Sequence, residues 1–194
     1  MRTLLYIHGM GGNAHEAEHF MEFFPCCDVV GVDYRGNTPW DVKHELLRAY
    51  SEYDAVGIIA NSIGAYFAMN AFQGVKVERA FFISPIVDME KLIADMMRYS
   101  GVTENELAER KEIALPSGEI LSWEYLCYVR DNQLTWNVPT HILYGENDIL
   151  TPYEVISSFA GKHNATLTVM QDGEHWFHTD EQIAFLDSWL KQYA

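Results

Sequence analysis

A serine stands between a short apolar run and an amphipathic segment in residues 54–72. The run at residues 55–60, AVGIIA, predicts a strand that is buried on both faces. From Ile63 onward, apolar side chains recur at helical spacing. The junction Ala60-Asn61-Ser62-Ile63-Gly64 matches the G-x-S-x-G nucleophile elbow, with alanine in place of the first glycine. This pattern would place the Ser62 hydroxyl above a sheet edge, where it could attack an acyl carbon.

The elbow motif alone leaves two roles open for Ser62. The small residues Ala60 and Gly64 leave room for a sharp turn. The amino end of the following helix would favour the negative charge that develops on an attacked carbonyl. Serine is equally a common N-cap at any junction of this kind, so a purely structural role is the alternative.

An acid and a base are expected after two later apolar runs. Asp148 follows the run at residues 140–144, and His175 follows the run at residues 166–170. Ser, Asp and His therefore occur in the chain order that one hydrolase architecture uses. In such a triad Ser62 attacks the carbonyl, His175 takes the serine proton, and Asp148 orients the imidazole. We predict that these three residues are catalytic.

Other groups compete for the acid and base roles. His178 is the main alternative base, because it lies three residues beyond His175. Asp88 is the main alternative acid, because it follows the apolar run at residues 80–84, and Glu146 and Asp172 are weaker candidates. The remaining histidines fall in predicted helices, at their ends or at the start of a strand, where a surface role is expected: His15, His19, His44, His141 and His163.

A glycine-rich loop, HGMGGN at residues 8–13, follows the first apolar run. Glycines allow backbone N–H groups to face a ligand, and the loop lacks the spacing of phosphate-binding loops. We expect the N–H groups of Met10 and Ile63 to form an oxyanion hole, and Gly9 and Gly11 to contact the substrate. His8 is expected to brace the loop by hydrogen bonding.

Six apolar runs must position these groups. They alternate with helical stretches and lie at residues 3–8, 29–33, 55–60, 80–84, 140–144 and 166–170. The predicted helices include residues 15–24 and 40–51. This alternation predicts an α/β fold with a mostly parallel six-stranded sheet and helices on both faces. Ligands bind beyond the carboxyl ends of such strands, where all the candidate groups lie.

Residues 86–137 interrupt the alternation with helical stretches at about 88–98, 104–112 and 122–130. We interpret this segment as a helical cap inserted into a single domain of residues 1–194. Methionine and aromatic side chains suit an adaptable apolar pocket wall. Met97 and Trp123 in this segment are expected to contact the substrate, together with Trp176 beside the predicted base.

Charge restricts the partners of the chain. Its 194 residues carry 28 acidic and 13 basic side chains, which give a formal net charge of -15. This charge disfavours nucleic acid, anionic membranes and polyphosphorylated ligands, so a small-molecule substrate is expected. The sequence leaves a homodimer open.

Cysteine usage and the absence of sorting signals indicate the expected setting of the protein. Three cysteines give no disulfide framework, and neither C-x-x-C nor H-E-x-x-H occurs. We therefore expect no metal and no organic cofactor. No signal peptide or membrane-length segment is recognisable, which predicts a cytoplasmic protein without a membrane partner.

Five motifs in this order resemble the α/β-hydrolase family. Residues 8–12 are similar to its oxyanion loop, residues 33–36 to its D-x-R-G turn, and residues 60–64 to its elbow. Residues 145–148 and 173–175 are similar to its acid and histidine loops. The chain departs from the family at Ala60 and in lacking the two leading strands. The resemblance implies a compact six-stranded member, with the second strand outside the first and the third beside it.

The motifs together predict a serine hydrolase of the carboxylesterase type. Its expected substrate is a small, neutral and fairly apolar ester, cleaved through an acyl-enzyme intermediate. A thioesterase and an aminopeptidase that removes N-terminal residues would use the same triad, so both remain alternatives. A ligand receptor with an idle hydrolase site is the alternative outside enzymes.

Overall fold

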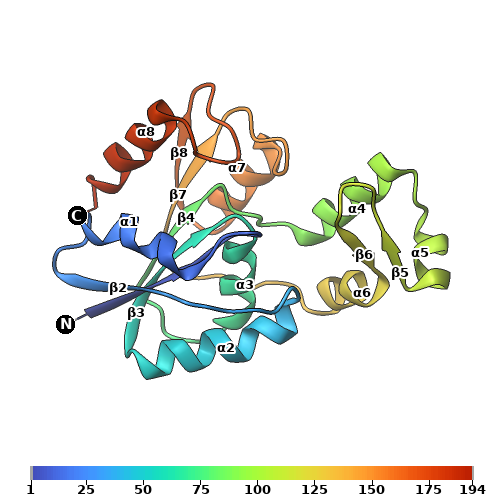
Figure 1. Cartoon of the computed structure of the whole chain (residues 1–194), viewed down its shortest axis with the longest axis horizontal. Coiled ribbons are helices and arrows are strands. Elements are labelled where there is room, and N and C mark those ends of the chain that lie inside the picture. The colour runs from blue at the N-terminus through green and yellow to red at the C-terminus, as the bar shows by residue number, and fades with distance from the viewer. Residues whose placement is uncertain (1, 194) are drawn as a thin grey trace. The chain divides into compact units, whose positions relative to one another are not determined.

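The computed structural model describes residues 2–193 and contains a six-stranded parallel sheet (Figure 1). The spatial order is β2-β1-β3-β4-β7-β8, and every neighbouring pair is parallel. This order confirms the expected arrangement around the first strand. The strands are β1 Arg2–Ile7, β2 Cys27–Gly31, β3 Ala55–Asn61, β4 Arg79–Ile83, β7 Thr140–Gly145 and β8 Thr166–Met170.

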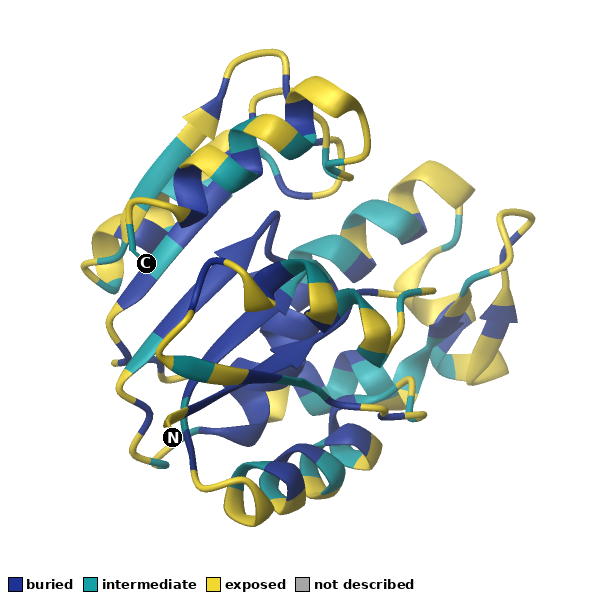
Figure 2. Ribbon diagram, turned by 60° about the vertical axis from the view of Figure 1, so that its left-hand side comes forward, coloured by how far each residue is buried: buried dark blue, intermediate teal, exposed yellow. Residues whose placement is uncertain are grey.

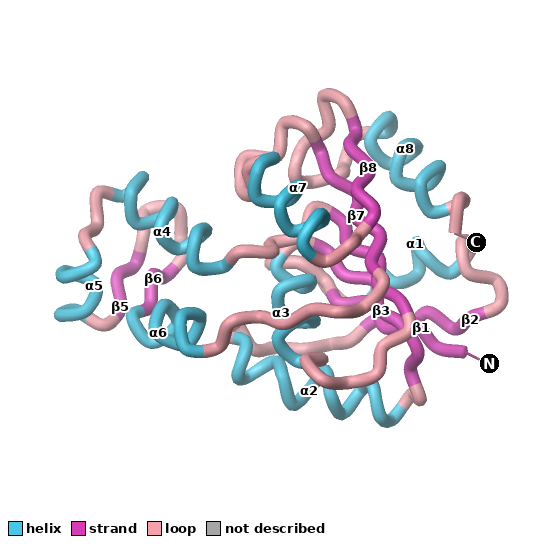
Figure 3. Tube along the Cα trace, turned by 180° about the vertical axis from the view of Figure 1, so that it is seen from behind, coloured by secondary structure: helices cyan, strands magenta, loops and turns pink. Residues whose placement is uncertain are grey.

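Helices cover both faces of this sheet (Figures 1 and 3). One face carries the short 3-10 helix η1 (Ala14–Glu16), α1 (Ala17–Met21) and α8 (Asp180–Leu190). The other carries α2 (Pro39–Glu52), α3 (Ile63–Ala71) and α7 (Tyr153–Lys162). The α/β fold with helices on both faces is therefore as predicted.

The core lies along the central strands, which Figure 2 shows as buried. Ile58 and Ile59 on β3 are completely buried although they point to opposite faces. On the α1 and α8 face, Tyr6 and Phe81 belong to one apolar cluster with Phe20 of α1 and Trp189 of α8. Burial of each large apolar side chain contributes about 1.5–3 kcal/mol, so this core fixes the strand ends that carry the site.

Two predicted boundaries differ from the structure at the start of the chain. The first helix was expected at residues 15–24, but helical structure runs over residues 14–21. It begins at residue 14 because Asn13 and Glu16 form a capping box. It ends before Phe24 because Pro25 disfavours a helical conformation in the residue that precedes it. The second strand was expected at residues 29–33 and is Cys27–Gly31, because Cys27 and Asp28 pair with β1 as part of an edge strand.

The contacts divide the chain into two compact units, and the second comprises Asp88–Leu134. It contains α4 (Met89–Ser100), α5 (Glu104–Arg110) and α6 (Trp123–Asp131), as predicted, and an antiparallel hairpin of β5 (Glu112–Ala114) and β6 (Ile120–Ser122) that was not. Strands of three residues are too short to show an alternating pattern. The turn-forming residues Pro116-Ser117-Gly118 were the signal in the sequence that could have indicated a hairpin. In the structure Gly118 has a φ of 103°.

Side chains hold the second unit together. The Asp88 carboxylate accepts a hydrogen bond from Lys91 N–H at 2.9 Å and so caps α4. Arg130 on α6 donates to Glu90 of α4 at 2.7 Å and forms a bidentate pair with Glu104 of α5 at 2.7 and 2.9 Å. The Arg130 guanidinium lowers the pKa of Glu104. One arginine thus links all three helices.

Across residues 2–193, every helix is either too short or too polar to span a lipid bilayer.

Candidate active site

Ser62 forms a sharp turn between β3 and α3. Its φ of 53° and ψ of -124° lie outside the regions that residues with side chains ordinarily adopt. The Ser62 N–H donates to the Ile83 carbonyl at 2.9 Å, and the Ser62 carbonyl accepts from Ala65 N–H at 3.1 Å. The backbone of neighbouring elements therefore sustains a strained residue, as is common at functional sites.

The elbow has no space for larger residues around Ser62. A Cβ atom on Gly64 would lie 2.4 Å from the His8 carbonyl oxygen and 2.5 Å from that of Ile7. A Cβ atom on Gly9 would lie 3.1 Å from Ser62 Cβ. Ala60 is completely buried. Close packing of the elbow against the end of β1 thus explains the small residues in the motif.

Two hydrogen bonds connect Ser62, His175 and Asp148. Ser62 Oγ lies 2.8 Å from His175 Nε2, and His175 Nδ1 lies 2.7 Å from Asp148 Oδ2. Because a carboxylate only accepts, His175 Nδ1–H donates to Asp148 and leaves Nε2 free to accept the Ser62 hydroxyl proton. The Ser62 side chain makes no capping hydrogen bond to α3. The Ser62 hydroxyl hydrogen-bonds to His175 and does not cap the helix.

The Asp148 carboxylate is fully buried and well supported. Its Oδ1 accepts hydrogen bonds from Leu150 N–H at 2.8 Å and Thr151 N–H at 3.0 Å. The exposed fraction of the side chain is 0% for Asp148 and 16% for His175. A buried carboxylate is costly unless its oxygens are paired, and here both oxygens are engaged. Asp148 is thereby held facing the imidazole.

The loops that carry Asp148 and His175 pack backbone against backbone. Asn147 N–H donates to the Gly173 carbonyl at 2.7 Å. A Cβ atom on Gly145 would lie 2.4 Å from the Glu174 carbonyl oxygen and 2.6 Å from Gly173. This close approach requires glycine at residue 145 and fixes the separation between the acid and the imidazole.

The glycine-rich loop turns sharply next to the elbow. Gly12 N–H donates to the Gly9 carbonyl at 3.1 Å, with Met10 and Gly11 at the tip and φ of 75° at Gly11. The hydrogen bond of this turn uses the N–H of Gly12 and not that of Met10. Ile63 begins α3, where the first N–H groups have no partner within the helix. These are the two N–H groups that were expected to face an oxyanion.

Two stacked rings support the start of this loop. The His8 and Tyr34 rings lie parallel, with centroids 4.1 Å apart. His8 Nδ1–H donates to the Gly9 carbonyl at 2.8 Å, and Tyr34 Oη–H donates to the His8 carbonyl at 2.7 Å. Burial raises the pKa of Tyr34 far above its usual value. His8 therefore braces the loop through hydrogen bonding, as the sequence suggested.

Glu16 supports the far end of the loop and was not singled out from the sequence. Its Oε1 accepts from Asn13 N–H at 3.1 Å, and its Oε2 accepts from Tyr6 Oη–H at 2.5 Å. Burial, together with this carboxylate, raises the pKa of Tyr6. A Cβ atom on Gly12 would lie 2.7 Å from Glu16 Oε1. The spacing Asn13-x-x-Glu16 fits a capping box and was the signal that could have identified it.

The competing acids and bases are engaged elsewhere. His178 Nδ1–H donates to the Trp176 carbonyl at 2.7 Å. Asp88 caps α4, and Glu146 accepts from Asp172 N–H at 3.1 Å. The imidazole that meets Ser62 is that of His175. Among residues 2–193 there is no group of three or more His, Cys, Asp or Glu side chains suited to a metal ion.

The predicted substrate contacts fall in both units. Gly9 and Gly11 lie in the glycine-rich loop, and Trp176, which is 69% exposed, follows His175 directly. Met97 and Trp123 lie on α4 and α6 of the second unit. Their contact with the substrate stays a prediction.

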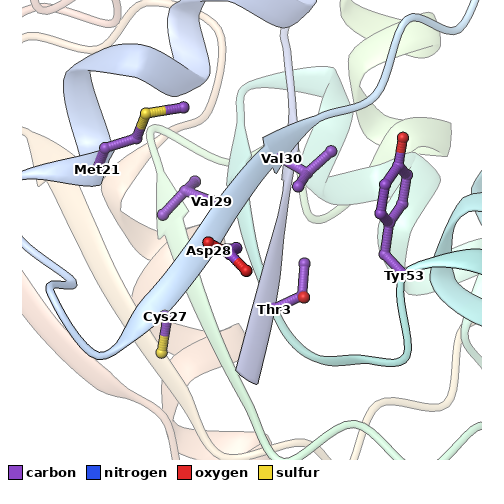
Figure 4. A pocket seen from close by; sticks show the side chains of 7 residues that line it. All are labelled: Thr3, Met21, Cys27, Asp28, Val29, Val30 and Tyr53. Atoms are coloured by element: carbon purple, nitrogen blue, oxygen red, sulfur yellow. The ribbon is translucent and has the colours of Figure 1, made fainter. Parts of the chain in front are cut away.

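Two recesses differ in their relation to the site. The larger, about 460 Å³, lies at the edge strand β2 and contains none of the residues that meet Ser62. Figure 4 shows its lining: Thr3, Met21, Cys27, Asp28, Val29, Val30 and Tyr53. The smaller, about 90 Å³, is lined by residues 8–11, residues 34–37, Ile63 and Phe67. We regard the smaller as relevant to chemistry because it includes the glycine-rich loop and the first residue of α3, whose N–H groups were expected to face an oxyanion.

Comparisons with known proteins identify the fold. No family model matches the sequence, and no curated protein matches it. Est1E from Butyrivibrio proteoclasticus superimposes with a TM-score of 0.74 at 16% identity, covering 99% of this chain and 86% of that one. The esterase domain of a Rhodothermus marinus protein gives a TM-score of 0.67 at 14% identity, covering 100% and 86%. A proline iminopeptidase-related protein from Thermus thermophilus gives 0.65 at 19% identity, covering 98% and 88%. The chain therefore has the α/β-hydrolase fold.

Proposed function

We propose that the protein is a serine hydrolase that cleaves a small, neutral and fairly apolar carboxylic ester. The observation that carries the proposal is the continuous hydrogen-bond chain from Ser62 Oγ through His175 to Asp148, at 2.8 and 2.7 Å. A serine in this arrangement is activated as a nucleophile by its neighbouring base.

The first half of the reaction forms an acyl-enzyme. Ser62 Oγ attacks the ester carbonyl carbon while His175 Nε2 takes the hydroxyl proton, and Asp148 stabilises the imidazolium. The carbonyl oxygen becomes negatively charged and is held by the N–H groups of Met10 and Ile63. The bond to the leaving oxygen then breaks as His175 returns the proton to it, which releases the alcohol.

The second half regenerates the enzyme. His175 removes a proton from water, and the resulting hydroxide attacks the acyl carbon. The bond to Ser62 Oγ breaks, Ser62 regains its proton from His175, and the carboxylic acid leaves. Every proton in this cycle moves through His175, so the chemistry requires no further group.

Exposed apolar side chains on the site loops support an apolar substrate. The exposed fractions are 72% for Met10 on the oxyanion loop and 88% for Ile149 beside Asp148. Trp176 follows His175 and is exposed as well. Large apolar side chains exposed at a site favour apolar ligands. The net charge of -15 disfavours substrates with several phosphates, including coenzyme-A thioesters.

Replacing the nucleophile tests the proposal. Ser62→Ala should lower turnover of p-nitrophenyl esters by a factor on the order of a million, because the triad acts as a unit. Circular dichroism and the melting temperature should stay close to those of the native protein. Comparable ester hydrolysis by Ser62→Ala would refute the proposal, whereas hydrolysis only of thioesters or N-terminal peptide bonds would retain the triad and replace the substrate.

A further inference from the structure

The cavity of about 90 Å³ lies on the opposite side of Ser62 from the imidazole. Ser62 follows β3, and the strand order β2-β1-β3-β4-β7-β8 places β7 and β8 on one side of it. The loops after β7 and β8 carry Asp148 and His175. The cavity walls at residues 8–11 and 34–37 follow β1 and β2, on the other side.

This placement matters because the three substituents of the attacked carbon need different surroundings. The leaving oxygen must face His175, which protonates it. The carbonyl oxygen must face the N–H groups of Met10 and Ile63. The acyl chain is the remaining substituent, and it must point away from His175, toward the side where the cavity lies.

We propose that this cavity is the acyl subsite and that it selects esters of short acyl groups, of about two to four carbons. The inference rests on the proposed function and deepens it. Its volume, about 90 Å³, is well below the roughly 300–1,000 Å³ of ordinary small-molecule pockets, so it has room for only a short acyl chain.

The inner walls of the cavity are rigid. Tyr34 stacks on His8 and donates a hydrogen bond to the His8 carbonyl. Phe67 on α3 is buried and meets the Tyr34 ring edge-on, with centroids 5.8 Å apart. Since each ring is held by another, the inner wall of the cavity cannot move back for a longer chain without disturbing the oxyanion loop.

The entrance is the part that substitution can alter without disturbing the core. Arg35 and Asn37 line the cavity and are exposed. A large side chain at residue 37 can therefore fill the entrance from the solvent side. Phe67→Ala instead enlarges the cavity from within.

Chain-length profiles test the subsite. With p-nitrophenol as the constant leaving group, kcat/KM should rise by up to about fourfold per methylene from acetate to butyrate and fall for hexanoate and octanoate. Phe67→Ala should move the maximum to a longer chain. Asn37→Trp should lower kcat/KM for butyrate at least tenfold relative to acetate. In a series of acetate esters with different leaving groups, both variants should rank the esters by kcat/KM in the same order as the native protein.

Matched measurements separate failure of the subsite from failure of the function. Labelling of Ser62 by alkyl fluorophosphonates of graded chain length should follow the same profile, and Asn37→Trp keeps the test informative if Phe67→Ala does not fold. The subsite is refuted if both variants leave the profile unchanged, or if Trp123→Ala moves the maximum and Phe67→Ala does not. The proposed function itself fails if Ser62→Ala hydrolyses esters of every length as fast as the native protein.

Discussion

The two units of the chain are stabilised in different ways. In the unit built on the sheet, the elements that carry the site approach so closely that Gly64 and Gly145 have carbonyl oxygens 2.4 Å from the position of a Cβ atom. In the unit of residues 88–134, the positive-φ residues Gly101 and Gly118 have no atom within 4 Å of that position. This unit buries apolar side chains of its own, such as Leu107 and Leu126, and its helices carry N-caps and are joined at the surface by the ion pairs of Arg130.

We expect the two units to differ in how well they tolerate amino-acid substitutions. Backbone packing fixes positions to fractions of an ångström, which a hydrogen-bond chain such as Ser62–His175–Asp148 requires. Surface ion pairs and caps contribute little individually and can be exchanged for others. We therefore expect substitutions in the sheet unit to reduce chemistry sharply and substitutions in the second unit to act locally.

Replacing one aspartate in each unit should give the largest difference in activity between the two units. Asp148→Asn should lower kcat by roughly four powers of ten, because the amide leaves His175 poorly oriented and its charged form unsupported. Asp88→Asn is the matched control and should do little, since asparagine is as good an N-cap as aspartate. Steady-state kinetics of both variants decide the point. A severe loss in Asp88→Asn with a mild one in Asp148→Asn would reverse the assignment of the acid.

Replacing one glycine in each unit should give the next largest difference, in the free energy of unfolding. Gly64→Ala should lower the free energy of unfolding by about 1–3 kcal/mol, because its methyl group meets the backbone at Ile7 and His8. Gly101→Asn should cost less than about 1 kcal/mol, because asparagine tolerates the left-handed conformation that follows α4. Urea unfolding of the two variants measures the difference. Equal losses would remove the distinction between the units.

The sequence predicted features that lie beside a recognisable apolar run and missed features that do not. The apolar runs and the motifs at strand ends located Ser62, Asp148 and His175, because each lies beside a run long enough to be recognised. The order of the first three strands followed from the resemblance to the α/β-hydrolase family, and the need of parallel neighbours for crossover connections predicted the helices on both faces. Glu16 was missed because its role depends on Tyr6, ten residues away in the chain, and the β5–β6 hairpin was missed because its strands have only three residues each.

Arg130 tests the second unit alone. Arg130→Ala should speed hydrogen exchange within residues 88–134, because α4, α5 and α6 lose their shared partner. Arg130→Lys should give an intermediate effect, since a lysine cannot form the bidentate pair with Glu104. Labelling of Ser62 by a small fluorophosphonate should keep its native rate. Faster exchange throughout the sheet unit would show that the two units are not stabilised separately.

Lowering the pH should produce the smallest effect, a loss of stability that arises from His141 in the sheet unit. Burial and the nearby Arg79 charge lower the pKa of His141 on β7, whose ring stacks on Phe81 and packs at a tilt against Tyr193. His141 therefore stays neutral to a lower pH in the folded protein than in the unfolded chain, which takes up a proton as pH falls through about 6.5. Stability should therefore decrease below that pH.

The control for this pH effect is His141→Gln, followed by urea unfolding between pH 7.5 and pH 5. The variant should be less stable at pH 7.5, because it loses ring stacking, and its stability should depend less on pH. The pair of Arg130 with Glu104 should persist in this range, because the pKa of Glu104 is lowered and its contribution is lost only at more acidic pH. An unchanged pH slope in His141→Gln would contradict this explanation.

We propose that Ser62 is a nucleophile activated by His175. The most direct measurement is intact-protein mass spectrometry after brief exposure to a fluorophosphonate, followed by peptide mapping. The native protein should gain one adduct, located on Ser62, and His175→Ala should gain it at a rate lower by several powers of ten. An adduct on another residue, or equal labelling of Ser62 in native protein and His175→Ala, would contradict the claim.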